Sequence, residues 1–362
     1  MKNLNDIVLQ FDLTGQVDSI KPLGNGLIND TYKVTTTDGP SYVLQRINHH
    51  IFKDVDLLQK NIVSVTSHIR GKLEAAGAVD VDRKVLTFIP LRNSDLTYYF
   101  DGESYWRVSL FIEDAFTYET VNPEYSYYAG RSFGHFEAML ADVPDTLGET
   151  IPDFHNMELR ARQLDEAVAA DAVGRMAEAE VQEILKEVLV YREEMCKAER
   201  MHREGVLPKR ICHCDTKVNN MMFDAESDKV LCVIDLDTVM PGFVLSDIGD
   251  FIRTGANTGA EDDENLDNVN VNMEIFKAYT RGYMEKAKSF LTPTEIKLLP
   301  YGGRLLTYMQ TVRFLTDYIN GDTYYKIHSP KHNLIRTKAQ FKLLQSLEAH
   351  AEEMDQFMSE WL

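Results

Sequence analysis

The sequence is short of cysteine, of positive charge and of long apolar runs, and each shortage excludes a class of protein. Four cysteines in 362 residues are too few for the disulfide framework of a small secreted domain. With 38 basic against 57 acidic residues, the net charge of −19 argues against a nucleic-acid groove or an anionic membrane as the partner. No apolar run in the sequence approaches the ~18 residues that a membrane span needs.

What remains is the composition of an ordinary globular protein. Apolar residues make up 44% of the chain and charged residues 26%, and 362 residues are enough for one large domain or two lobes. The first six residues, M-K-N-L-N-D, lack the apolar centre of a secretory signal. We therefore expect a cytoplasmic protein that binds neither nucleic acid nor membrane.

The most informative stretch is I-C-H-C-D-T-K-V-N-N-M-M-F-D at residues 211–224. Its spacing H-x-D-x-K-x-x-N is typical of the catalytic loop of protein-kinase-like phosphotransferases. Because phosphoryl transfer is catalysed mainly by positioning and charge neutralisation, Asp215 is predicted to face the acceptor hydroxyl and take its proton. Lys217 can point the same way and meet the transferring phosphate. Asn220 offers a neutral amide oxygen, a hard ligand for Mg²⁺.

A second metal ligand follows this loop. Residues 221–223 are apolar, residues 224–229 form a polar turn, and the β-branched run at 230–234 ends in Asp235. The pattern predicts a hairpin that returns Asp235 to the catalytic loop as a Mg²⁺ ligand. The alternative is that the two aspartates are turn or cap residues. The recurrence of two ligand-type residues at kinase spacing favours the metal site.

Two further motifs are I-D-L-D-T-V-M-P-G at 234–242 and S-D-I-G-D at 246–250. Together with H-x-D-x-x-x-x-N they resemble the motifs of the aminoglycoside phosphotransferase and choline kinase family. Within it the chain is most similar to the N-acetylhexosamine 1-kinases, and the resemblance runs from about Gly24 to about Leu344. It also includes L-G-N-G-L-I-N-D-T-Y, Y-V-L-Q-R-I-N, R-F-L-T-D-Y and H-N-L-I-R-T-K.

The resemblance implies a two-lobed, protein-kinase-like α+β fold. Residues 1–113 would form a sheet-rich nucleotide-binding lobe, residues 114–362 a helical catalytic and acceptor-binding lobe, and ATP with Mg²⁺ would lie in the cleft. The implied reaction is ATP-dependent phosphorylation of the anomeric hydroxyl of an N-acetylhexosamine, GlcNAc or GalNAc. That hydroxyl is a better acid than an ordinary alcohol, which eases the demand on Asp215 as a base.

The nucleotide site is expected in the first lobe. Gly24 and Gly26 lie in a turn between two predicted strands, where backbone amides can approach phosphate oxygens; a plain hairpin turn is the alternative. Gln45 stands where kinases carry the phosphate-binding lysine, and the helix that follows has Asn61 but no carboxylate near its middle. Either neutral amides replace the usual Lys–Glu pair, or Arg46 substitutes for the lysine.

By the same resemblance, the hinge after the last strand binds the adenine edge. This assigns the adenine to the backbone of Phe111, Ile112 and Glu113.

The acceptor sugar has candidates in both lobes. Asn29 and Asp30, next to the glycine turn, could face the sugar. In the second lobe, Arg313 and Tyr324 match positions that bind sugar in the resembled family. The alternative for Arg313 is an ion pair with Asp317, four residues on in the same helix.

Periodicity predicts the elements that carry these residues. Strands are expected at 17–23, 31–36, 41–47, 80–90, 97–100 and 105–113. Helices are expected at 3–13, 55–73, 125–140, 246–253, 272–287, 293–320 and 336–361, with two more within 158–205 that break near Gly174.

Two other functions stay open. The chain could phosphorylate another small alcohol, such as choline, homoserine or an aminoglycoside, or it could be a non-catalytic nucleotide-binding pseudokinase. The presence of Asp215, Asn220 and Asp235 together argues against the pseudokinase, which has no need to keep them.

Overall fold

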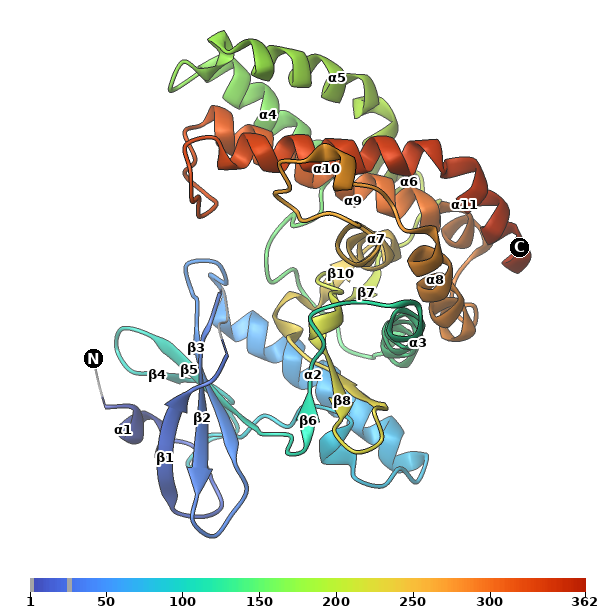
Figure 1. Cartoon of the computed structure of the whole chain (residues 1–362). Coiled ribbons are helices and arrows are strands. Elements are labelled where there is room, and N and C mark those ends of the chain that lie inside the picture. The colour runs from blue at the N-terminus through green and yellow to red at the C-terminus, as the bar shows by residue number, and fades with distance from the viewer. Residues whose placement is uncertain (1–2, 25–27) are drawn as a thin grey trace. The chain divides into compact units, whose positions relative to one another are not determined.

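A computed structural model describes residues 3–24 and 28–362 (Figure 1). The chain forms two compact units. The first, here called the sheet unit, comprises residues 1–118, 142–152 and 219–240, and the second, the helical unit, comprises residues 119–141, 153–218 and 241–362. The lobe boundary expected after residue 113 stays a prediction. Within the described ranges, no helix is long and apolar enough to cross a membrane.

The sheet unit is built on a five-stranded antiparallel sheet in the order β1-β2-β3-β5-β4. Gln45 lies directly opposite Arg107 in the pairing of β3 with β5, and Leu44 lies opposite Val108. The strands are β1 (Val17–Pro22), β2 (Asp30–Thr36), β3 (Tyr42–Ile47), β4 (Tyr99–Phe100) and β5 (Tyr105–Leu110).

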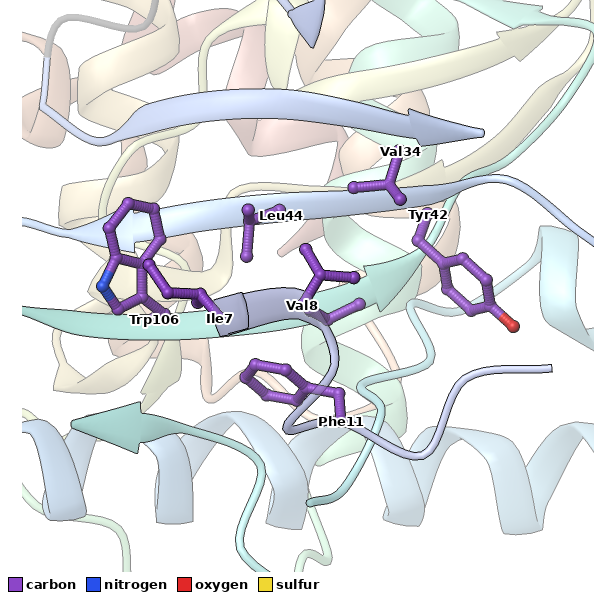
Figure 2. Packing of buried hydrophobic residues seen from close by; sticks show 8 residues of the cluster. Ile7, Val8, Phe11, Val34, Tyr42, Leu44 and Trp106 are labelled. Carbon is purple, nitrogen blue, oxygen red and sulfur yellow. The ribbon is translucent and has the colours of Figure 1, made fainter. Parts of the chain in front are cut away.

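One face of this sheet carries an apolar core (Figure 2). Residues from α1 (Leu4–Val8) and the segment after it pack there against side chains from β2, β3 and β5. Because side chains alternate along a strand, Trp106 and Val108 face this core, and Arg107 between them faces the other side of the sheet. The core residues are Ile7, Val8, Phe11, Val34, Tyr42, Leu44, Trp106 and Val108.

Helix α2 (Val55–Ala75) also belongs to the sheet unit. It begins at Asp54, whose side chain accepts a hydrogen bond from the Leu57 amide, a typical N-cap. The strand predicted at 80–90 is wrong. Asp80 has a left-handed backbone (φ 53°), a 3₁₀ helix follows at η1 (Val81–Arg83), and only an isolated bridge pairs Phe88 with Ser109.

A second, three-stranded sheet in the order β6-β8-β9 completes the unit. It contains the hairpin predicted around Asp224–Lys229, since β8 pairs antiparallel with β9. The elements are β6 (Ala115–Phe116), η3 (Val218–Asn220), β8 (Met221–Asp224), β9 (Val230–Val233) and η4 (Leu236–Thr238).

The helical unit contains most of the helices. Helix α3 packs against α8, and α9 packs against α4, α7 and α10 (Figure 1). The elements are α3 (Pro123–Leu140), α4 (Met157–Ala170), η2 (Arg175–Ala177), α5 (Ala179–Met195), α6 (Lys197–Arg203), β7 (Arg210–Cys212), β10 (Met240–Gly242), α7 (Val244–Gly255), η5 (Leu266–Asn268), α8 (Met273–Ala287), α9 (Pro293–Ile319), α10 (His332–Ala349), α11 (Ala351–Met358) and η6 (Ser359–Trp361).

Two helix predictions needed correction here. The region 158–205 holds three helices, since α4 ends at Asp171 in a left-handed conformation and α5 gives way to α6 at Cys196. The single helix expected at 336–361 is two, because the helical backbone breaks at His350 (φ −106°, ψ 8°) between α10 and α11. The breaks at Cys196 and His350 contain no proline, so the sequence pattern did not predict them.

Helices α3 and α8 approach backbone to backbone. A Cβ atom added at Gly130 would lie 1.9 Å from the Tyr279 carbonyl oxygen, and one at Gly282 would lie 2.0 Å from the Tyr127 carbonyl oxygen. Both distances are far inside van der Waals contact with backbone that belongs to the partner helix. The crossing therefore requires glycine at both positions.

Gly130→Ala should lower the melting temperature strongly, because overpacking a fixed backbone costs on the order of 1–3 kcal/mol or more. Gly71 in α2 is the matched control, since a Cβ there meets nothing within 4 Å. Gly71→Ala should stabilise the chain by up to ~1 kcal/mol, because alanine is the better helix former. Thermal unfolding of both variants tests this, and equal shifts would contradict it.

Candidate active site

The β8–β9 hairpin brings the two predicted metal ligands to one end of the sheet unit. The Asn220 carbonyl accepts a hydrogen bond from the Ile234 amide (2.9 Å), so Asp235 follows directly on a residue bonded to Asn220. Asp235 is exposed and left-handed (φ 57°), a conformation that aspartate tolerates better than most residues. The arrangement suits Mg²⁺, which takes one or two protein oxygens and completes its shell with phosphate and water.

No group of three or more histidine, cysteine, aspartate or glutamate side chains gathers into a metal cage within residues 3–24 and 28–362. A site of one aspartate and one asparagine does not need such a cage, because the substrate phosphates supply the other ligands. The assignment of Asn220 and Asp235 stays a prediction.

The turn after Asp235 is held by a buried network. The carboxylate of Asp237, which is 3% exposed, accepts hydrogen bonds from the Arg107 guanidinium (2.5 Å) and from Asn29 Nδ2 (2.6 Å). The Asp237 carbonyl oxygen accepts from the Thr150 hydroxyl (2.9 Å). Each oxygen of the residue is thus satisfied, which a buried carboxylate requires.

Asn29 therefore has a different environment from the one expected. Its Nδ2 donates to Asp237, and its Oδ1 accepts from the Asn48 amide (2.9 Å). Both polar ends are used inside the sheet unit, which favours a positioning role over the predicted sugar contact. Asp30 forms an ion pair with Arg46, its cross-strand partner.

The place of the usual kinase lysine is taken by an amide that holds an arginine. Gln45 Oε1 accepts from Arg107 Nε (2.9 Å), and Gln45 Nε2 donates to the Thr31 hydroxyl (3.2 Å). Arg46 is engaged with Asp30 instead. Both side chains are thus engaged within the chain, and the choice between the two alternatives stays a prediction.

Asn61 of α2 is the second amide of this kind. Its Nδ2 donates to the carbonyl oxygens of Gly148 (2.7 Å) and Val239 (3.0 Å), and its Oδ1 accepts from the Gly148 amide (3.2 Å). It therefore ties α2 to the chain just after the turn at Asp235.

The remaining nucleotide-site predictions stay predictions. Gly24 has a left-handed φ of 68°, and nothing lies within 4 Å of a Cβ built there, whereas Gly26 lies outside the described residues. In the hinge, the Phe111 amide donates to the Ser41 carbonyl (3.0 Å) and the Glu113 carbonyl accepts from Arg83 (3.1 Å). These two groups are engaged within the chain, and Ile112 between them is buried.

Residues 213–217 of the predicted catalytic loop belong to the helical unit, where one buried carboxylate holds their backbone. Asp247 accepts hydrogen bonds from the amides of His213 and Cys214, both at 2.7 Å. The Thr216 hydroxyl donates to the Asp247 carbonyl (2.5 Å). Cys214 is left-handed (φ 63°), so the loop makes a tight turn that these bonds hold in place.

A second buried carboxyl stands behind Asp247. Burial raises the pKa of Glu137 well above its usual range, and the Asp247 charge raises it further. Glu137 Oε2 accepts a hydrogen bond from the Tyr283 hydroxyl (2.6 Å). Burial also raises the pKa of Asp247, although its hydrogen bond with Glu137 works in the opposite direction.

Asp215 and Lys217 form an ion pair (2.7 Å), with side chains 26% and 44% exposed. Burial works to lower the pKa of Lys217, but the Asp215 and Asp250 carboxylates outweigh it and leave the pKa raised. Lys217 therefore carries its positive charge at neutral pH. The Asp215 amide donates to His213 Nδ1 (3.3 Å), which ties the base to its own loop.

Asp250 interacts electrostatically both with Lys217 of this pair and with His155, which in turn interacts with the predicted acceptor residue Arg313. Burial works to raise the pKa of Asp250, but the Arg253 and Lys217 cations hold it below its usual value. Burial lowers the pKa of His155 to about 3, with Asp250 acting against the shift and Arg313 adding to it. His155 is therefore a neutral imidazole at neutral pH, set among charged neighbours.

Arg313 does not form the ion pair with Asp317 that was its alternative role. Arg313 donates to Gln310 Oε1 (3.2 Å), and its guanidinium lies 5.8 Å from the Tyr324 ring centre. Asp317 instead accepts from the amides of residues 323–325, at 2.8–3.0 Å, and from Asn333 (2.9 Å). It thereby fixes the loop that presents Tyr324.

Sequence reasoning gave no role to Arg107, Asp237 or Glu137. A signal existed for the first two: a lone arginine in the strand Y-W-R-V-S-L, and a second aspartate in I-D-L-D. Glu137 lay in a helix pattern with nothing to mark it as buried.

Similar solved structures share this fold. An amicoumacin kinase in complex with AMP-PNP and Ca²⁺ has a TM-score of 0.59 at 14% identity, covering 94% of this chain and 92% of its own. A choline/ethanolamine kinase family protein from Mesorhizobium loti gives 0.56 at 13%, covering 95% and 92%. A spectinomycin phosphotransferase in complex with ADP and spectinomycin gives 0.55 at 13%, covering 98% and 99%.

These similarities confirm the predicted two-lobed, kinase-like α+β fold. The model of the "Phosphotransferase enzyme family" matches residues 19–282, a span that includes the predicted catalytic loop, the β8–β9 hairpin and the strand that carries Gln45. By this match over most of its length, the chain belongs to the phosphotransferase enzyme family.

Proposed function

We propose that the chain phosphorylates the anomeric hydroxyl of an N-acetylhexosamine, with ATP as donor and Mg²⁺ held by Asn220 and Asp235. The observation that carries the acceptor class is a donor-rich cluster in the helical unit. It is linked by charge interactions to the Asp215–Lys217 pair and is here called the acceptor cluster. Its members are His155, Arg160, Arg313, Tyr324 and Tyr325.

The acceptor cluster contains two guanidiniums without an ion pair among the described residues, although the charges of Asp153, Asp250 and Glu261 act on its members. Arg160 donates to the carbonyl oxygens of Asp153 (3.2 Å) and Phe154 (2.8 Å), and Arg313 donates to Gln310. Within the described part of the chain, neither guanidinium forms an ion pair. Burial and the Arg313 charge lower the pKa of Arg160, so the two cations repel each other in the absence of a ligand.

This charge pattern selects the acceptor. A cationic alcohol such as choline is favoured by aromatic and acidic walls, and two unpaired guanidiniums would repel it. Sugar hydroxyl and amide oxygens accept the hydrogen bonds that arginine and tyrosine side chains donate. Two groups in the cluster are also ready for such a partner, since Arg160 Nε and His155 Nδ1 are buried without a hydrogen bond.

In the proposed reaction, Asp215 accepts the proton of the acceptor hydroxyl and orients its oxygen. Lys217 stays charged because of its two carboxylate neighbours and meets the phosphoryl group during transfer. ATP supplies the phosphoryl group, and Mg²⁺ neutralises its charge. Asp247 keeps the backbone of the loop in place while the proton moves, since its hydrogen bonds are buried.

The fold alone does not choose the acceptor, because the similar structures are named for amicoumacin, spectinomycin, choline and ethanolamine. Kinases of other small alcohols are therefore the alternative within the family. A non-catalytic pseudokinase is the alternative outside catalysis.

A panel of sugars and amino alcohols tests the acceptor. N-acetylglucosamine and N-acetylgalactosamine should give 1-phosphates with ATP, and choline should give no product. Phosphorus NMR identifies the position of the phosphate. A phosphate on C6, or turnover with amino alcohols only, would overturn the acceptor assignment, and no turnover with any alcohol would favour the pseudokinase.

Arg313→Ala should raise the KM for the sugar by about 10-fold or more, since a hydrogen bond from a charged group contributes roughly 1.5–3 kcal/mol. The KM for ATP should change little. Arg281→Ala is the control, because Arg281 is exposed on α8 and stacks over Phe357. Parallel KM shifts for both substrates in Arg313→Ala would remove Arg313 from the acceptor cluster.

Asp215→Asn should lower kcat by about 10²-fold or more, because the amide cannot take a proton. Nucleotide binding, measured by calorimetry with ADP and Mg²⁺, should survive, since Asp215 is not assigned to the nucleotide. Near-normal turnover in this variant would exclude Asp215 as the base.

Asp235→Asn should raise the Mg²⁺ concentration for half-maximal activity by about 10-fold or more, since a charged ligand is lost. Asparagine tolerates the left-handed backbone, so the change tests charge rather than strain. Asp228→Asn is matched to it, because Asp228 is left-handed (φ 56°) in the same hairpin. Equal Mg²⁺ requirements in the two variants would reject Asp235 as a ligand.

A further inference from the structure

We propose that the Arg107–Asp237 ion pair positions the metal-binding turn, in a chain where Gln45 stands at the place of the usual kinase strand lysine. Arg107 and Asp237 are positioning residues here, acting on the metal through Asp235. The proposal rests on the proposed function only in that Asp235 binds the metal–nucleotide complex. It makes no use of the acceptor's identity.

The pair is buried on both sides. The Arg107 and Asp237 side chains are 4% and 5% exposed, with Nη1 and Oδ1 2.5 Å apart. Removing two charges from water costs several kcal/mol per ion, and their attraction only roughly offsets this cost. A pair of this kind contributes little net stability. Its two charges are compensated only when the guanidinium and the carboxylate keep this one geometry. Positioning is the effect that such a pair supplies.

Both partners are themselves fixed by further hydrogen bonds. Arg107 Nε donates to Gln45 Oε1, and the two residues face each other across β5 and β3. The second carboxylate oxygen of Asp237 accepts from Asn29, and its carbonyl accepts from Thr150. The guanidinium cannot swing away from the carboxylate without breaking bonds on both sides.

Hydrogen bonds join the turn after Asp235 to strand β3 and to helix α2. Gln45 of β3 holds Arg107, which pairs with Asp237. Asn61 of α2 donates to the Val239 carbonyl. The turn is therefore held by two separate elements of the sheet unit.

The geometry gives Asp235 its orientation. Asp235 precedes Asp237 by two residues, and Leu236 between them is buried. A non-glycine residue in left-handed backbone costs on the order of 1 kcal/mol and persists only where its surroundings impose it. The bonds to residues 237 and 239 supply that constraint, so loosening them frees the ligand to leave the productive orientation.

The test measures ADP binding by calorimetry at increasing Mg²⁺ concentrations, without any acceptor present. Asp237→Asn keeps the shape of the side chain and removes its charge. It should raise the half-saturating Mg²⁺ concentration by about 10–100-fold, the usual effect of changing a group that orients a metal ligand. ADP binding in the absence of Mg²⁺ should change by less than about 3-fold, since neither partner of the pair is assigned to the nucleotide.

Val108→Ala is the matched control for stability. Val108 is next to Arg107 on β5, is fully buried, and faces the apolar core on the opposite side of the sheet. It should lower the melting temperature and leave the Mg²⁺ titration unchanged. If Asp237→Asn behaves like Val108→Ala, the pair is merely structural and the proposal fails.

Gln45→Ala keeps the proposal testable if Asp237→Asn does not fold. It removes the bond that holds Arg107 Nε, together with the hydrogen bond from Gln45 to the Thr31 hydroxyl. It should raise the Mg²⁺ requirement by roughly 3-fold, a smaller share of the same effect. An unchanged titration in a folded Gln45→Ala would then overturn the proposal. A native chain that binds ADP without any Mg²⁺ dependence would overturn both this proposal and the metal site of the proposed function.

Discussion

A buried carboxylate has to be surrounded by hydrogen-bond donors, and this constraint shapes three loops of the described chain. Asp237 accepts hydrogen bonds from Arg107 and Asn29 and so fixes the turn that carries Asp235. Asp247 draws two backbone amides of the catalytic loop. Burying an aspartate carboxylate without hydrogen-bond donors costs several kcal/mol. Each loop is therefore restricted to conformations that place donors around its buried aspartate.

The acceptor side follows the same rule. Asp317 is 5% exposed and collects three successive amides from the loop after α9, together with Asn333. The effect is to hold a polar, aromatic loop steady at the surface while Tyr324 itself stays exposed. The conformation of such a loop is fixed by side chains that pack beneath it rather than by its own residues. A segment without regular secondary structure can therefore hold functional side chains in defined positions.

The global charge of −19 and the local charges point in opposite directions. The guanidiniums of Arg160 and Arg313 donate to uncharged oxygens, and Lys217 keeps its proton because the Asp215 and Asp250 carboxylates raise its pKa. The net charge describes the solvent-exposed surface and says little about the chemistry of the site.

The sequence predicted most of the fold and the chemically marked residues. The antiparallel strands, the β8–β9 hairpin and the long helices carry clear periodicity, and H-x-D-x-K-x-x-N marks the catalytic loop. The failures have physical causes. Residues 80–90 read as a strand because apolar alternation does not show a left-handed turn at Asp80, and Arg107 became visible only when pairing placed it opposite Gln45. Tertiary pairing, not local pattern, decides such positions.

The exchange of a lysine for an arginine held by a glutamine changes how this chain responds to chemical reagents. A lysine amine can lose its proton and react as a nucleophile, whereas a guanidinium stays protonated at any pH that a folded protein tolerates. Acylating reagents that inactivate kinases through the strand lysine therefore find no amine at Gln45 or Arg107.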